Sequence, residues 1–285
     1  MLAPRIDRIA TRLLFHPFAQ SLNGHRGPRV PILMYHSVSE QSGPRRHPYF
    51  DTNTSPEIFA QHMTFLRESG YSSVGISTAL DFIREGKKGE KHVVITFDDG
   101  YRDFYTAAFP ILRENGFTAT VFLVTSLVGA RKDGRECLTW SEVRDLYSRG
   151  IEFGSHTVTH PELKRLEPKE VEEEIGRSKD TIEHQLGSQV KSFSYPYAFP
   201  EAHRKFVRSL RARLEKEGYN NGVSTIIGTA GSRSDPFFLP RLPANSWDDL
   251  PFFRAKLEGG YDWLYVFQYA SKSVIGHLGW FSGSI

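Results

Sequence analysis

Two adjacent carboxylates and two spaced histidines are the residues of this chain whose types suit metal chemistry best. Asp98 and Asp99 follow one predicted strand, and His156 and His160 follow another. Neighbouring carboxylates repel each other, and a bound cation is the usual compensation. Two imidazoles and one carboxylate leave positions on a Zn²⁺-like ion for water and substrate.

Neither motif decides the chemistry alone. An Asp-Asp-Gly run is more typical of a turn or a helix N-cap. His156 and His160 present both imidazoles to one metal if their segment is a helical turn, because residues i and i+4 share a face. Isolated pairs at this spacing are surface or packed histidines about as often as ligands.

The elements that must position these residues alternate between strand and helix. Strands are predicted at 29–35, 92–97, 118–124, 151–154, 190–195 and 219–227, and the main helices at 55–69, 103–115, 141–149, 168–186 and 202–217. Such repeated units favour a parallel sheet covered by helices. We expect an α/β fold: a single-domain (β/α) barrel, distorted or incomplete, of about seven strands. Chemistry in such barrels sits at the C-terminal strand ends.

Four predicted strands each end in a polar residue of a kind that binds metal or transfers protons. They lead into His36, into the Asp98-Asp99 pair, into His156 and into Pro196-Tyr197. This coincidence is far more specific than any single motif.

The motifs together resemble the polysaccharide deacetylase family, also called carbohydrate esterase family 4 or the NodB-homology domain. The resemblance rests on TFDDG at 96–100, HTVTHPEL at 156–163 and SYPY at 194–197. ILMYHSV at 32–38 is similar to one branch, which carries an N-terminal Tyr-His motif. The resemblance covers about residues 30–260.

The resemblance implies a role for each matching residue. Asp99, His156 and His160 would bind the metal, and Asp98 would be the general base that activates water. The backbone N–H of Tyr197 would help to hold the oxyanion, and His36 would protonate the leaving amine. Thr157 and Pro196 would lie around the ligands or the substrate.

The chain departs from the family pattern at two places. Ser194 stands where the family often has an arginine near the catalytic acid, and Arg241 would restore that charge from another loop, unless it is an ordinary surface arginine. A late Leu-His motif is also missing, since His277 is misplaced relative to the chain end. His36 is therefore the expected acid.

The expected function is a metal-dependent hydrolase that removes N-acetyl groups from amino sugars of a glycan, glycolipid or polysaccharide precursor. The expected cofactor is a divalent metal, with Zn²⁺ ahead of other first-row ions. Two alternatives stay open. One is hydrolysis of non-sugar amides or O-acetyl esters by the same site. The other is a non-catalytic glycan-binding module.

Composition limits the partners. The 285 residues are 39% hydrophobic and 24% charged, with a formal net charge of +3. No block of Lys and Arg stands out, so no nucleic-acid partner is expected. The single cysteine, Cys137, cannot form a disulfide framework within one chain. The sequence leaves the oligomeric state open.

We divide the chain into three parts. Residues 1–28 form an amphipathic segment without the apolar core of a signal peptide, 29–260 the catalytic domain, and 261–285 an aromatic-rich segment. The first segment is expected to be a helix packed on the body or lying on a surface. We expect a cytoplasmic protein, with peripheral membrane contact through the termini as an option.

Overall fold

Seven parallel strands form a closed barrel in the computed structural model, which describes residues 5–22, 27–40, 51–86 and 89–269. In their order around the ring the strands are β2 (Ile32–Tyr35), β14 (Leu239–Pro243), β12 (Asn221–Ile227), β11 (Ser192–Ser194), β10 (Glu152–Ser155), β7 (Thr120–Leu123) and β6 (Lys91–Phe97). Pairing of β2 with β6 closes the ring. The predicted barrel of about seven strands is confirmed, and it is closed rather than incomplete.

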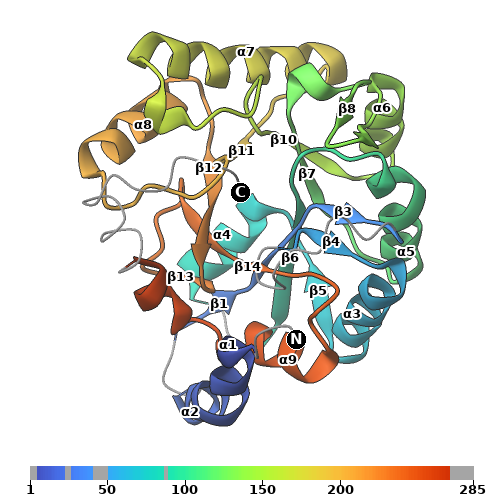
Figure 1. The fold of residues 1–285 in the computed structure, drawn as a ribbon, viewed down its shortest axis with the longest axis vertical. Coiled ribbons are helices and arrows are strands. Elements are labelled where there is room, and N and C mark those ends of the chain that lie inside the picture. The colour runs from blue at the N-terminus through green and yellow to red at the C-terminus, as the bar shows by residue number, and fades with distance from the viewer. Residues whose placement is uncertain (1–4, 23–26, 41–50, 87–88, 270–285) are drawn as a thin grey trace.

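Helices surround the barrel (Figure 1). They are α3 (Pro56–Glu68), α5 (Phe109–Glu114), α6 (Trp140–Ser148), α7 (Pro168–Leu186), α8 (Arg204–Lys216) and α9 (Leu250–Leu257). Helices α3 and α7 begin or end at the residues expected from the sequence. Ser55 caps α3, whose first residue is Pro56, and Gly187 ends α7 with a φ of 64°.

Helix α4 (Ile76–Glu85) closes one opening of the barrel. Its buried residues cluster with barrel-interior side chains, among them Ile32, Val94 and Leu239. Side chains alternate along a strand, so Thr96 and Asp98 face the same interior as Val94, and Arg241 the same interior as Leu239. The apolar side chains of α4 and of these strands therefore fill one end of the barrel, and the polar residues lie at the other end.

Several short strands lie outside the barrel ring. β5 (Tyr71–Ser73) pairs with the start of β6, and β1 (Arg29–Val30) pairs with β13 (Ala230–Gly231). β3 (Ser37–Val38) pairs with β4 (Asn53–Thr54). A hairpin of β8 (Arg131–Lys132) and β9 (Arg135–Glu136) follows β7 in the chain.

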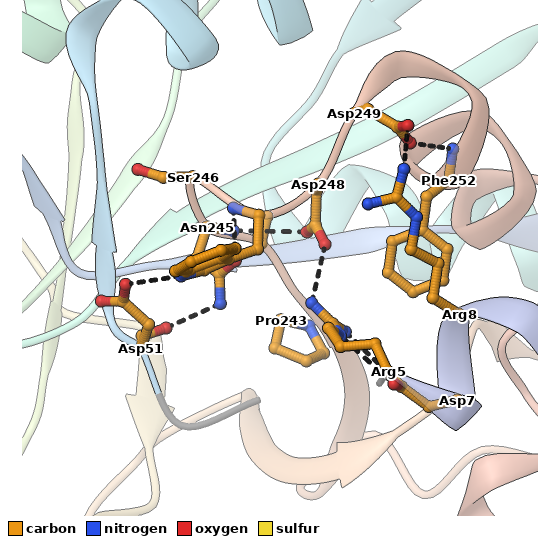
Figure 2. Close-up of polar contacts among 12 residues, drawn as sticks. Arg5, Asp7, Arg8, Asp51, Pro243, Asn245, Ser246, Asp248, Asp249 and Phe252 are labelled. Carbon is orange, nitrogen blue, oxygen red and sulfur yellow. Dashed lines mark hydrogen bonds and ion pairs between the residues drawn. The ribbon is translucent and has the colours of Figure 1, made fainter. Parts of the chain in front are cut away.

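The N-terminal segment is helical, as expected, but its polar side chains face the body. It comprises α1 (Ile6–Ala10), a π-helical turn at Thr11–Phe15 and α2 (His16–Leu22). Arg5 and Arg8 pair with Asp248 and Asp249 at the start of α9 (Figure 2). The apolar stripe of this segment is consequently turned toward solvent.

The aromatic-rich C-terminal segment is described only to residue 269, and its remaining residues lie outside the described part. The Trp263 ring stacks on Phe15 with centroids 4.5 Å apart, and residues 264–269 are helical. The two termini of the described chain therefore contact each other. None of the described helices has the length and apolar character that crossing a membrane requires.

Candidate active site

Asp99, His156 and His160 converge at the polar end of the barrel. One ligand atom from each lies within 4.8 Å of the other two. Asp99 Oδ1 is 3.8 Å from His156 Nε2 and 3.5 Å from His160 Nε2. Asp99 and His156 are buried and His160 is half-buried. The structure thus brings together the three residues expected to bind metal, from the ends of β6 and β10.

The two histidines are oriented by different contacts. The Nδ1 of His156 lies 2.8 Å from the Ser194 carbonyl, which leaves Nε2 free to bind a metal. The backbone N–H of His160 donates to Thr157 Oγ1 at 3.0 Å. The hydroxyl of Thr157 therefore helps to place the second histidine.

The segment from His156 to His160 is not a helical turn. Thr157 and His160 have φ values of 71° and 60°, in the left-handed region. The expected helical i, i+4 geometry is therefore wrong, although both imidazoles still converge. The backbone bends between them, and the two imidazole rings lie at a centroid distance of 4.7 Å.

Glu174 on α7 holds this turn. Its Oε2 accepts the backbone N–H groups of Val158 and Thr159 at 2.8 and 2.9 Å, and its Oε1 accepts the Thr159 hydroxyl. A carboxylate that satisfies three donors makes strong, charge-assisted hydrogen bonds. Glu174 is thus a positioning residue that sequence reasoning did not identify.

Arg241 binds Asp98 inside the barrel. Its Nη1 and Nη2 donate to the two carboxylate oxygens at 2.8 and 2.7 Å, and its Nε donates to the Ser224 carbonyl. Arg241 also contacts Ser194 Oγ, which itself lies 3.2 Å from Asp98. Arg241 belongs to β14 and is 1% exposed, so its expected place on a loop, and the alternative of a surface arginine, are wrong.

His36 lies next to Asp98 by strand register. Tyr35 pairs with Phe97, and the Asp98 N–H donates to the Tyr35 carbonyl. Burial lowers the pKa of His36, while the charges of Asp98 and Asp99 oppose that shift. His36 is therefore close enough to sense both carboxylates, and its imidazole is neutral at neutral pH.

Tyr197 and Pro196 follow β11. Pro196 is buried, whereas Tyr197 is partly exposed, and its ring lies 4.5 Å from that of His160. The Tyr197 carbonyl accepts the Thr225 hydroxyl, and within the described chain its N–H meets no acceptor. That N–H is available to a ligand.

Left-handed backbone is concentrated at this site. Across the described part of the chain, five non-glycine residues have positive φ: Asp99, Asp133, Thr157, His160 and Tyr197. Four of them are residues singled out by their motifs, and the fifth lies in the β8–β9 hairpin. Such conformations cost of order 1 kcal/mol or more each and cluster at functional sites. Backbone strain thus marks the same site independently of residue type.

Lys132 is a further residue at the site that the motifs did not indicate. The β8–β9 hairpin carries its ammonium to 2.6 Å from Asp99 Oδ1. The Lys-Asp-Gly run signals a turn in the sequence, but nothing local indicates where its lysine reaches. The Lys132 ammonium therefore contacts the carboxylate of Asp99, which is predicted to bind the metal.

The charge states suit a cation. Burial raises the pKa of Asp98, but the charge of Arg241 outweighs it and holds that pKa below its usual range. The pKa of Asp99 is also lowered, because the imidazoles around it, His36 foremost, and the Lys132 side chain oppose the effect of burial. Burial lowers the pKa of His156, and that of His160 to about 3. Ionised carboxylates and neutral imidazoles are the forms that bind metal.

The spacing also suits a tetrahedral ion. Ligand bonds of about 2.1 Å at the tetrahedral angle separate two ligand atoms by about 3.4 Å. The separations of 3.5 and 3.8 Å from Asp99 to the two histidines are close to that value. The three residues therefore fit a Zn²⁺-like ion without a large rearrangement.

Known proteins give the family context. The family model described as polysaccharide deacetylase matches residues 85–220. A protein of Bacillus subtilis (strain 168), YxkH, provisionally named a polysaccharide deacetylase, is 33% identical over 215 residues, covering 75% of this chain and 71% of its own. The poly-beta-1,6-N-acetyl-D-glucosamine N-deacetylase of Escherichia coli (strain K12) is 37% identical over 138 residues, which are 44% of this chain and 20% of that protein.

Solved structures show the same fold. The Streptococcus pyogenes deacetylase PplD, solved in complex with acetate, aligns with a TM-score of 0.69 at 24% identity. The alignment covers 81% of this chain and 99% of that one. At this identity the likeness shows the fold alone.

Proposed function

Because the chain belongs to the polysaccharide deacetylase family, we propose that it hydrolyses the N-acetyl groups of amino sugars in a glycan, glycolipid or polysaccharide precursor. The observation that carries this proposal is the convergence of Asp99, His156 and His160 beside the Arg241-bound Asp98. The name of the Escherichia coli relative, which specifies an N-acetylglucosamine polymer, supports the substrate class.

The residues divide the work of amide hydrolysis. Zn²⁺ or another first-row divalent ion, held by Asp99, His156 and His160, would supply a Lewis acid and a more acidic water. Asp98 would take the proton of the attacking water, while Arg241 fixes the carboxylate and keeps it ionised. An ionised base held in one orientation saves reorganisation when the water attacks.

The remaining steps fall to His36 and Tyr197. The free backbone N–H of Tyr197 would donate to the carbonyl oxygen as it becomes negative. His36 would give a proton to the departing nitrogen. Burial disfavours the charged form of His36, whereas the charges of Asp98 and Asp99 favour it, and the proton that Asp98 takes from the water would reach the departing nitrogen through His36.

Acetate release tests this proposal. Protein loaded with Zn²⁺ is expected to release acetate from N-acetylglucosamine oligomers faster than from simple acetyl esters or N-acetylated amino acids. Faster release from esters or non-sugar amides would favour the alternative substrates. Retained metal with no release from any acylated compound would favour a glycan-binding module.

Two asparagine variants test the division between the adjacent carboxylates. Asp98→Asn and Asp99→Asn are both expected to abolish acetate release, because each removes a different part of the machinery. Only Asp99→Asn is expected to lose bound metal by elemental analysis. Equal metal loss in both variants would reject separate roles.

A further inference from the structure

The N-terminal helix exposes its apolar side chains. Ile6, Ile9, Leu13, Leu14 and Phe18, here called the N-terminal apolar face, are each between 53% and 72% exposed. A surface helix of a globular protein normally buries its apolar stripe and exposes its polar side. This helix does the opposite. Single exposed apolar residues are common on protein surfaces, but here five of them lie on one helical segment.

Polar contacts fix the helix in this orientation. The Arg5 guanidinium donates to Asp7, and the Tyr261 hydroxyl donates to the same carboxylate at 2.9 Å. His16 pairs with Glu258 at 2.6 Å. Together with the aspartates at the start of α9 (Figure 2), these contacts hold the polar side against the body. Rotating the apolar face inward would break the contacts that join this segment to Tyr261, Glu258, Asp248 and Asp249.

The C-terminal helical turn extends the apolar surface. Val266 and Phe267 are 64% and 62% exposed. Phe267 contacts Trp263 at a centroid distance of 5.3 Å, and Trp263 stacks on Phe15 of the N-terminal helix. The Trp263 indole N–H also donates to Thr11. Two exposed apolar segments from opposite ends of the described chain are thus joined through one tryptophan.

The charges around this surface favour an anionic partner. The carboxylates beside it pair with arginines: Asp7 with Arg5, Glu258 with Arg254, and Asp262 with Arg29. Arg12 is exposed and takes part in no ion pair within the described chain. Residues 1–30 contain five arginines and no lysine, against one acidic residue.

We propose that the N-terminal apolar face, with Val266 and Phe267, docks on the surface of an anionic lipid bilayer. An exposed apolar helix face flanked by arginine is the arrangement of helices that lie in the membrane interface. Anionic headgroups attract Arg12, and the half-exposed rings of Tyr265 and Tyr269 suit the headgroup level.

Vesicle binding by the full chain tests the proposal. The protein is expected to cosediment with phosphatidylcholine vesicles that contain phosphatidylglycerol, and much less with pure phosphatidylcholine. The triple variant Leu13→Ser/Leu14→Ser/Phe18→Ser is expected to lose at least about tenfold in partitioning. Arg12→Glu is expected to remove the preference for anionic vesicles.

Matched controls separate this role from folding and catalysis. Tyr147→Ser removes a partly exposed apolar ring from α6 and is expected to leave vesicle binding unchanged. All variants should keep the melting temperature and the acetate release measured on a soluble oligomer. Equal vesicle binding by the triple variant, or no binding by the wild type, would overturn the proposal. So would a wild-type dimer that ignores vesicles and that the triple variant converts to a monomer.

Discussion

Arg241 binds both carboxylate oxygens of Asp98 across 143 residues of sequence. Both side chains are buried, so water does not screen the charge of either partner. A planar guanidinium matches a carboxylate in two parallel hydrogen bonds and cannot lose its proton at any relevant pH. This contact holds the predicted base in one place and in one charge state.

Loss of this pair should affect turnover and stability without affecting metal content. Arg241→Met is expected to lower kcat by on the order of 100-fold, because the base loses its fixed position. It should also destabilise the fold by about 3 to 5 kcal/mol, since a buried charge loses its partner. Acetate release, urea unfolding and elemental analysis measure the three quantities.

The double variant Asp98→Asn/Arg241→Met is the control for stability. Neutral asparagine removes the uncompensated charge, so this variant should be more stable than Arg241→Met alone. If the two unfold at the same urea concentration, the buried charge is not the cause of the instability.

Lys132 should compete with the metal. Its ammonium contacts Asp99 Oδ1, where a ligand bond would form, so the positive charge of the lysine repels a cation bound to the same carboxylate. Lys132→Met is therefore expected to tighten the metal Kd on the order of tenfold, measured by competition with a chelating dye. Arg131→Met, in the same hairpin but 63% exposed, should leave the Kd unchanged. A weaker Kd in Lys132→Met would show that the lysine assists metal binding instead.

Glu174 should support metal binding from outside the ligand set. In Glu174→Gln the amide nitrogen cannot accept, so the turn that carries His156 and His160 loses at least one of its three hydrogen bonds, and the others lose their charge assistance. Glu174→Gln is expected to weaken the metal Kd by about 10- to 100-fold, as is typical when a group that orients ligands is removed. Glu173→Gln, one residue earlier on α7 and solvent-exposed, serves as the control. Equal Kd values in the two variants would rule out this role.

His62 should make the fold sensitive to acid. Its ring is buried, with Nδ1 3.0 Å from the Tyr35 hydroxyl and Nε2 2.7 Å from the Asp248 carbonyl, and burial lowers its pKa to about 4. The unfolded chain takes up a proton here near pH 6.5, but the folded chain does so only near pH 4. The contribution of His62 to stability is therefore complete above pH 6.5 and falls as pH decreases toward 4.

The measurement is urea unfolding between pH 4 and 7. Each pH unit in this window should remove at most about 1.4 kcal/mol through His62. His62→Gln does not titrate, so its stability should fall less steeply over the same window. Parallel curves for the two proteins would assign the pH dependence to other groups.

The sequence by itself determined the barrel and the chemistry-bearing positions. Strand and helix periods are local, and in a parallel barrel every strand ends at the same face. Asp99, His156 and His160 could therefore be placed together from strand ends alone. The family motifs added expected roles, which remain predictions residue by residue.

Only the tertiary structure decided what meets these residues from elsewhere in the chain. Arg241, Lys132 and Glu174 act through contacts that no local pattern encodes, because each comes from a different strand, hairpin or helix. The left-handed backbone at Thr157 and His160 likewise depends on its surroundings. Periodicity showed that the N-terminal helix is amphipathic, but which side meets the body depended on charges near α9. Local sequence sets where a side chain points from its own element, and packing sets its partner.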